Sequence, residues 1–192
     1  MRRTRIFLGV VVVLALIACG RIVGDDQGGE TDPGAGRAED VIGGVASPGP
    51  TPDGPQALGL RIGDPATVSS QGSEIGRITA RNVRVRTEPD TSLGEAPEFG
   101  RFVIVEIDAQ ATGSGTFIVG PLDFWLLDAD GQRYAYGDGN ALFSVGASFA
   151  HAELAPGEQV TGDLAFDAPD GSLELVYAPG LDSRVLLSWA ID

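Results

Sequence analysis

Hydrophobic residues follow three successive patterns along this chain. Residues 6–18 form an unbroken apolar run, and the stretch that follows, up to residue 56, contains few large apolar side chains. From residue 57 onward, apolar and polar positions alternate with a period of two. That period is typical of strands with one buried face, and no segment keeps the 3.6-residue period of an amphipathic helix. The pattern predicts an all-β domain at residues 57–192.

Three stretches carry the strongest strand signal. Apolar residues alternate with others from Leu58 to Ile62, and residues 75–86 change register near Arg81–Asn82, which predicts a β-bulge there. Residues 101–111 are apolar on both parities, which predicts a central strand. Further strands are expected at residues 116–119, 124–127, 133–136, 149–154, 159–166, 173–177 and 185–191.

Turn residues separate these strands. The segment Asp128–Gly131 is expected to form a hairpin turn in which Gly131 takes a positive φ, and Pro156-Gly157 and Asp170-Gly171 are further turns. Many short strands separated by regular turns predict an antiparallel β-sandwich.

The N-terminal apolar run has the properties of an export signal. It follows a basic start with Arg2, Arg3 and Arg5. Thirteen helical residues would span about 20 Å, which is too short for a bilayer core of about 30 Å. We therefore predict a signal peptide at residues 1–18.

The run ends in Leu16-Ile17-Ala18-Cys19-Gly20, which resembles the lipobox of bacterial lipoproteins. The resemblance implies a diacylglyceryl thioether on Cys19, cleavage before it, and anchoring on the extracytoplasmic face of the cell membrane. An ordinary secretory signal with an incidental cysteine is the alternative. Cys19 is also the only cysteine, so no intrachain disulfide can form.

Residues 19–56 are predicted to be a disordered linker. Residues 47–55 include four prolines, and such a composition cannot bury enough apolar surface to offset its ordering entropy. Val41-Ile42-Gly43-Gly44-Val45 is an apolar patch within the linker, but it is too short to fold alone. The linker would lift the domain off the membrane.

Charge narrows the choice of partner. Every cationic side chain is an arginine, and three of the 13 precede residue 19. Residues 19–192 therefore carry 10 arginines against 27 acids, a formal charge of −17. Such a surface repels phosphate backbones, so we expect no nucleic-acid binding.

The side chains needed for catalysis are scarce. Nucleophilic catalysis needs a base beside the nucleophile, yet His151 is the only histidine and there is no lysine for a Ser–Lys pair. Zinc and copper sites are not expected either, because these metals prefer histidine, cysteine or methionine ligands, and residues 19–192 offer only His151 and Cys19. We therefore expect neither an enzyme nor a cofactor.

Two weak sets of candidate binding residues remain. Asp123, Asp128, Asp130 and Asp138 cluster in sequence around one hairpin and could offer oxygen ligands to calcium, but their spacing does not fit an EF-hand and turn formation is the favoured role. Trp125, Tyr134 and Tyr136 could stack against a sugar, although core or boundary positions are the favoured interpretation.

Two motifs resemble those of an immunoglobulin-like family of unknown function, related to the mycobacterial immunogenic secreted antigen. They are Phe124-Trp125-Leu126-Leu127-Asp128-Ala129-Asp130-Gly131-Gln132-Arg133-Tyr134 and the segment from Leu154-Ala155-Pro156-Gly157-Glu158 to Gly162-Asp163-Leu164-Ala165-Phe166-Asp167-Ala168-Pro169. The resemblance covers residues 57–192 and implies an immunoglobulin-like sandwich in a secreted or lipid-anchored protein. The hypothesis is a noncatalytic, tethered module that binds a protein or cell-wall partner. Carbohydrate- or calcium-assisted wall binding is the alternative.

Overall fold

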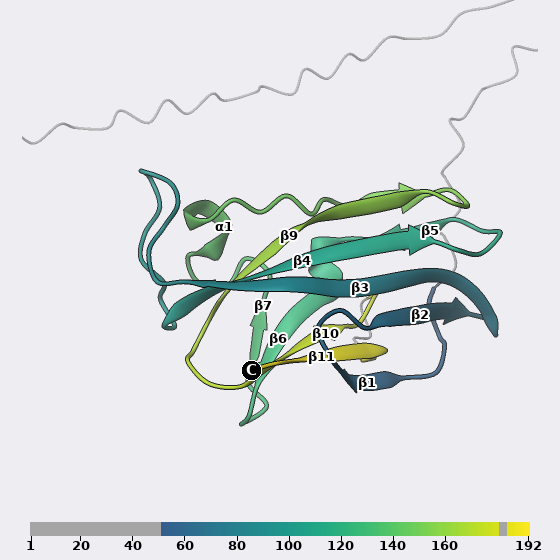
Figure 1. Ribbon diagram of the computed structural model, residues 1–192, viewed down its shortest axis with the longest axis horizontal. Helices are drawn as coiled ribbons and strands as arrows, with labels where there is room; N and C mark the ends of the chain where they lie inside the picture. Colours follow the sequence, from purple (N-terminus) through teal and green to yellow (C-terminus); the bar gives the residue numbers. More distant parts are fainter. Residues whose placement is uncertain (1–50, 181–183) are drawn as a thin grey trace, which may run out of the picture. The chain divides into compact units, whose positions relative to one another are not determined.

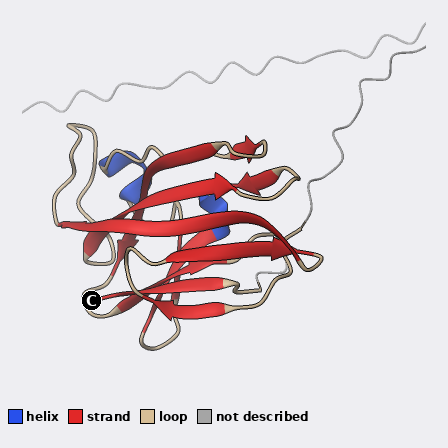
Figure 2. Ribbon diagram, turned by 45° about the vertical axis from the view of Figure 1, so that its right-hand side comes forward, coloured by secondary structure: helices blue, strands red, loops and turns tan. Residues whose placement is uncertain are grey.

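The computed structural model describes residues 51–180 and 184–192, all within one compact unit, Val45–Asp192. The predicted signal peptide, Cys19 and most of the predicted linker lie outside the described residues. Two β-sheets lie against each other, with a small two-stranded sheet beside them (Figure 1). Apart from two short helical segments, the described elements are all strands (Figure 2). The predicted immunoglobulin-like β-sandwich is confirmed.

The first sheet has five strands. Its pairs are antiparallel except for the first two strands in the spatial order, which are parallel. In that order the strands are β1 (Ala57–Leu60), β11 (Leu187–Ile191), β10 (Leu173–Tyr177), β6 (Phe124–Asp128) and β7 (Arg133–Ala135).

The second sheet has four antiparallel strands, and two further strands form the small sheet. The four are β2 (Pro65–Ser70), β3 (Ser73–Arg86), β4 (Arg101–Ala111) and β9 (Gln159–Ala168), and the small sheet pairs β5 (Phe117–Val119) with β8 (Ala152–Leu154).

Strand β3 defines two ends of the domain. Its 14 residues span about 45 Å at roughly 3.3 Å per residue. The Ser70 hydroxyl, just before β3, donates to the carbonyl of Thr51, the first described residue. The start of β3 therefore marks the tether-side end. Its last residue, Arg86, leads into the β3–β4 loop at the opposite end, beside the single helical turn α1 (Ala141–Ser144) (Figure 1).

The core lies between the two large sheets. Its largest fully buried side chains are aromatic: Trp189, Tyr177, Phe124, Phe166 and Phe117. The indole N–H of Trp189 donates to the Asp64 carbonyl at 3.0 Å, which satisfies its one polar atom inside the core.

Strand β4 confirms the predicted central position. Val103, Val105 and Ile107 point into the main core. Phe102 and Ile104, on the other face, pack in a second cluster against the α1 segment. The apolar residues on both parities thus face two different cores.

Two local predictions are also confirmed. The pairing of β3 with β4 shifts register between Arg81 and Val83, at the predicted bulge. Gly131 has a φ of 81°, which a residue with a Cβ rarely adopts.

The sequence pattern did not predict three elements, namely β2, α1 and the short helix η1 (Pro121–Asp123), and it misplaced the start of the domain. Strand β2 was not predicted, because Ala66 and Val68 are its only inward apolar residues and give a weak signal. The α1 turn is too short to show a helical period. Residues 51–56, assigned to the linker, contact the domain: the Asp53 and Gly54 amides donate to the Ser69 carbonyl.

Candidate functional site

The sequence-predicted aspartates lie in turns. The Asp128 carboxylate accepts the backbone N–H groups of Asp130 and Gln132, at 3.0 and 2.8 Å, and the Tyr134 hydroxyl at 3.1 Å. The bond from the Gln132 amide is the main reason that the pKa of Asp128 is below its ordinary value. These contacts hold the hairpin in shape, and Asp130 is exposed within it.

The other two aspartates also bind backbone amides. Asp123 accepts the N–H of Gly120 at 2.8 Å, and Asp138 accepts that of Ala135 at 2.7 Å. Burial raises the pKa of Asp123, and the bond from Gly120 partly opposes that rise. Within residues 51–180 and 184–192, no group of three or more His, Cys, Asp or Glu side chains is placed to hold a metal ion.

Trp125 is not an exposed stacking platform. It lies on the outer face of the five-stranded sheet, where its side chain is only 4% exposed and packs against Val176 and Ala178. The Arg133 guanidinium sits 3.8 Å from the centre of its ring. Because the neighbouring strand β7 brings this cation over the indole, the ring face is not free for a sugar.

The two tyrosines are half-buried. Tyr134 and Tyr136 both pack against the main core, and Tyr134 also meets the ring of Phe99 edge-on at 5.5 Å. Neither forms a flat exposed aromatic surface with Trp125, so the structure does not bring the candidate aromatic residues together.

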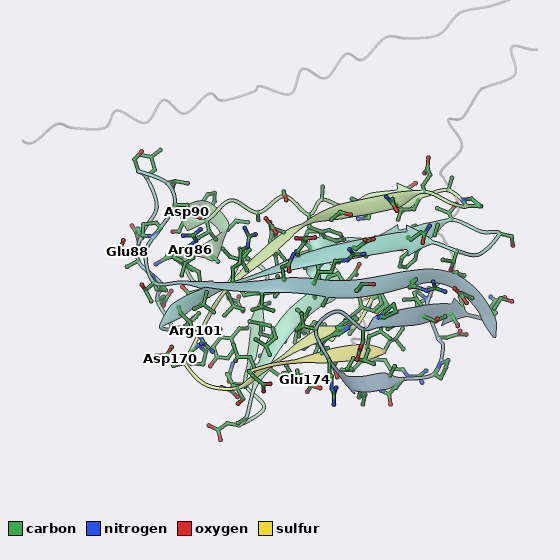
Figure 3. The ribbon with its side chains drawn as sticks, in the orientation of Figure 1. Arg86, Glu88, Asp90, Arg101, Asp170 and Glu174 are labelled. Atoms are coloured by element: carbon green, nitrogen blue, oxygen red, sulfur yellow. The ribbon has the colours of Figure 1, made fainter. Side chains whose placement is uncertain are left out.

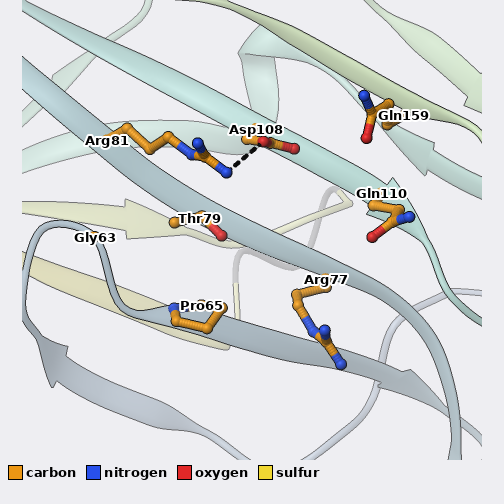
Figure 4. A pocket seen from close by; sticks show the side chains of 8 residues that line it. All are labelled: Gly63, Pro65, Arg77, Thr79, Arg81, Asp108, Gln110 and Gln159. Carbon is orange, nitrogen blue, oxygen red and sulfur yellow. Dashed lines mark ion pairs between the residues drawn. The ribbon is translucent and has the colours of Figure 1, made fainter.

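A polar groove of about 550 Å³ follows the outer face of β3 and β4 (Figure 4). Arg81 pairs with Asp108 at 2.7 Å inside it, and Arg84 pairs with Asp163 at 2.6 Å farther along the same face. Cross-strand ion pairs of this kind occupy both partners and give the groove no single sign of charge. It is a weaker candidate site than the exposed apolar surface at the end of the domain opposite Thr51.

Large apolar side chains are exposed at the end opposite Thr51. Leu93, in the β3–β4 loop, is 92% exposed, and Phe143 and Leu142, on α1, are 78% and 38% exposed. We call the surface formed by these three residues the apolar tip. Exposed apolar side chains grouped on loops are typical of interaction surfaces.

Hydrogen bonds brace the two segments of the apolar tip against each other. The Thr91 hydroxyl donates to the Phe143 carbonyl at 3.0 Å, and the Asp90 amide donates to the Ser144 carbonyl at 2.7 Å. The buried Ser144 hydroxyl accepts the Glu95 N–H at 3.0 Å and donates to the Glu95 carbonyl at 2.8 Å. Leu93 and Phe143 are thus displayed on connected backbones.

A fully buried carboxylate ties both segments to β9. Asp167 accepts the backbone N–H groups of Glu98 at 2.7 Å, Phe99 at 3.0 Å and Asn140 at 3.0 Å. Three amide donors satisfy a charge that would be costly to bury alone. Asp167 therefore positions the loop before β4 and the start of α1 together.

The rim of the apolar tip is acidic. Four exposed acids, Glu88, Asp90, Glu95 and Glu98, lie in the β3–β4 loop beside one cation, Arg86. Arg86 lies 3.6 Å from Asp90, and Figure 3 shows both near Glu88 at this end of the domain. The rim would repel an anionic surface and attract a cationic one.

The sequence pattern did not point to the apolar tip or to Asp167 as parts of a site. The available signal was an isolated leucine and phenylalanine in turn-rich segments, Ser92-Leu93-Gly94 and Leu142-Phe143-Ser144. That signal cannot show that the two segments meet, because about 50 residues separate them.

These features define an immunoglobulin-like sandwich module whose end loops display apolar side chains. The chain belongs to the DUF4352 family, described as a domain of unknown function, whose model matches residues 61–184. No curated protein matches the chain significantly.

Two solved structures share the fold. The secreted protein MPT63 from Mycobacterium tuberculosis is 18% identical with a TM-score of 0.50, and the match covers 70% of this chain and 96% of that protein. The yjhA protein from Bacillus subtilis is also 18% identical, with a TM-score of 0.52 and coverage of 69% and 99%. Within the described ranges of this chain, no helix is long and apolar enough to cross a bilayer.

Proposed function

We propose that this chain is a noncatalytic lipoprotein, anchored through Cys19 to the extracytoplasmic face of the cell membrane, whose apolar tip binds a protein partner. The observation that carries the proposal is the bracing of Phe143 and Leu93. Both side chains are exposed, yet buried Ser144 and Asp167 fix the backbones that display them. Preorganised loops lose less conformational entropy on binding, which favours a recognition role.

The position of the apolar tip supports a partner away from the anchor. The linker joins the domain at the tether-side end, and β3 separates that end from the tip by about 45 Å. The tip is therefore remote from the point where the linker joins the domain, and that junction leaves it accessible.

The acidic rim specifies the chemistry of the partner. Phe143 and Leu93 would fit an apolar pocket on the partner. The four acids of the β3–β4 loop would attract arginine or lysine side chains around that pocket. The same acids disfavour anionic lipid headgroups and nucleic acids.

The inventory of side chains supports the noncatalytic part of the proposal. The chain has one histidine, His151, and its single cysteine stands at the predicted lipidation position. The acids singled out in the sequence bind backbone amides in turns, apart from exposed Asp130. Sugar stacking has less support than protein binding, because Arg133 covers Trp125.

Site-specific photo-crosslinking in the native cell envelope tests the proposal. A photoreactive phenylalanine analogue at position 93 is expected to give a discrete adduct with a protein, and Phe143→Asp is expected to reduce its yield at least tenfold. Loss is expected because a carboxylate cannot enter an apolar pocket.

Leu122 provides the matched control. It is 77% exposed, close to the 78% of Phe143, but it lies at the tether-side end. Leu122→Asp is expected to leave the adduct at position 93 unchanged. An adduct that survives Phe143→Asp, or that Leu122→Asp removes equally, would overturn the proposal.

A further inference from the structure

The polar groove on the outer face of the four-stranded sheet is separate from the apolar tip. Its volume of about 550 Å³ falls within the range of small-ligand sites, about 300–1,000 Å³. Gly63 and Pro65, from the turn before β2 and from β2 itself, line one part of it. The remaining lining consists of six side chains with hydrogen-bonding groups: Arg77, Thr79, Arg81, Asp108, Gln110 and Gln159 (Figure 4).

Strand pairing places these side chains in rows across the sheet. In one row Arg77 on β3 lies opposite Gln110 on β4, which in turn lies opposite Gln159 on β9. In the next row Thr79 lies opposite Asp108. Neighbours within a row are about 5 Å apart, and successive rows are about 7 Å apart, because every second residue of a strand faces the same side. The sheet therefore fixes a regular array of donors and acceptors.

The β-bulge at Arg81–Val83 keeps the later cations of β3 on the same outer face. In a regular strand Arg84 would point to the opposite side from Arg81. After the shift in register, Arg84 instead pairs with Asp163 of β9 at 2.6 Å on the outer face. Bulges that re-aim side chains are common beside functional sites.

The charges of the groove are balanced. Arg81 pairs with Asp108 at 2.7 Å inside it, and Arg77 lies 3.5 Å from Glu74 beside it. The surroundings differ, because residues 19–192 carry a formal charge of −17. A guanidinium and a carboxylate in an ion pair keep further N–H donors and oxygen lone pairs for other partners. The groove thus offers hydrogen bonds without a net charge, which favours an uncharged ligand.

We propose that the polar groove binds a neutral oligosaccharide through hydrogen bonds to the sugar hydroxyls. Each hydroxyl both donates and accepts, so a sugar matches a surface that does the same. The amides of Gln110 and Gln159 supply donors and acceptors, Asp108 accepts, and Arg77 donates. None of the described residues that line the groove is aromatic, so the contact relies on hydroxyl groups and not on ring stacking.

A glycan array followed by an NMR titration tests the proposal. The protein is the chain from residue 19 onward with Cys19→Ser, and the array carries neutral oligosaccharides beside uronate-bearing ones. A neutral oligosaccharide is expected to bind and to shift the backbone amide resonances of residues 77–81 and 108–110. Its dissociation constant is expected to change less than about twofold between about 0.05 and 0.5 M salt, because the contact forms no ion pair.

A double variant tests the contribution of the two amides. Gln110→Ala with Gln159→Ala is expected to weaken binding at least about tenfold, because several hydrogen bonds to the ligand are lost. Thermal unfolding checks that this variant remains folded. Gln132→Ala is the matched control, since Gln132 is an exposed glutamine in the turn between β6 and β7 of the other large sheet. It is expected to leave the affinity unchanged.

Several outcomes would overturn the proposal. They are the absence of any neutral ligand on the array, binding confined to the uronate-bearing glycans, a steep dependence on salt, and an equal effect of the double variant and Gln132→Ala. Phe143→Asp is expected to leave the affinity for the oligosaccharide unchanged. A loss in that variant would assign the sugar to the apolar tip instead. The failure of this proposal is therefore distinguishable from the failure of the proposed function.

Discussion

The two ends of this domain expose nearly equal apolar side chains but support them in different ways. Phe143 at the apolar tip and Leu122 at the tether-side end are 78% and 77% exposed. Behind Phe143, buried Ser144 and Asp167 bind backbone groups of two separate loops. Behind Leu122 lies an open pocket with proline walls. Exposure alone therefore does not separate the two ends, whereas the buried polar support behind the side chain does.

Removal of the Asp167 carboxylate should have the largest effect. Asp167→Ala leaves three amide donors without an acceptor, which we expect to cost about 3 kcal/mol of unfolding free energy. Asp167→Asn keeps one acceptor oxygen and should cost less. Denaturant titration measures both, and a loss below about 1 kcal/mol for the alanine variant would show that the loops do not depend on this brace.

Two glycines near the apolar tip differ in what an added side chain would contact. Both Gly139 and Gly137 have positive φ, 60° and 95°. A Cβ on Gly139 would lie 2.5 Å from the Asp167 carboxylate, whereas one on Gly137 would meet nothing within 4 Å. Gly139→Ala should therefore destabilise the domain by about 2 kcal/mol more than Gly137→Ala. Equal midpoints of thermal unfolding would contradict a rigid contact between Gly139 and Asp167.

Truncation of the exposed side chains separates binding from stability. Phe143→Ala and Leu122→Ala should each change the unfolding free energy by no more than about 0.5 kcal/mol, because neither side chain is packed inside the core. Only Phe143→Ala should weaken the partner adduct at position 93. If Phe143→Ala lowers the unfolding free energy by well over 1 kcal/mol, the phenylalanine is a structural residue. Its exposure would then no longer support a binding role for the apolar tip.

The smallest expected effect is a pH dependence of opposite sign for two aspartates. Burial raises the pKa of Asp123 above 3.8, so its ionisation destabilises the fold as pH rises through the folded-state pKa. The bond from Gln132 lowers the pKa of Asp128, so its contribution to stability is present above 3.8 and is lost as pH falls through the folded-state pKa.

Relative to the parent chain, Asp123→Asn should therefore be more stable at pH 7 than at pH 3, and Asp128→Asn should be less stable. Thermal unfolding of the two variants at both pH values measures the difference. Shifts of the same sign in both variants would mean that burial and hydrogen bonding do not act on these carboxyls as described.

Features that depend on local backbone chemistry and on side-chain periodicity could be predicted from the amino-acid sequence. The two-residue period predicted the strands, the change of parity predicted the bulge at Arg81–Val83, and the Asp-Gly turn predicted the positive φ of Gly131. The apolar residues on both parities of residues 101–111 predicted a central strand, which the structure buries against two separate clusters. Each of these signals lies within a few neighbouring residues.

The contacts between those elements could not be predicted, because they depend on how the strands pair and pack in the folded domain. Arg133 covers Trp125 because β7 pairs with β6, and no periodicity records which cation lies over which ring. In the sequence, Asp167 is one polar residue within a strand. Only the folded chain brings it to Glu98 and Asn140, which are 69 and 27 positions away. Such contacts depend on sheet packing and loop closure over long sequence separations, so the support beneath Phe143 appears only when the chain is folded.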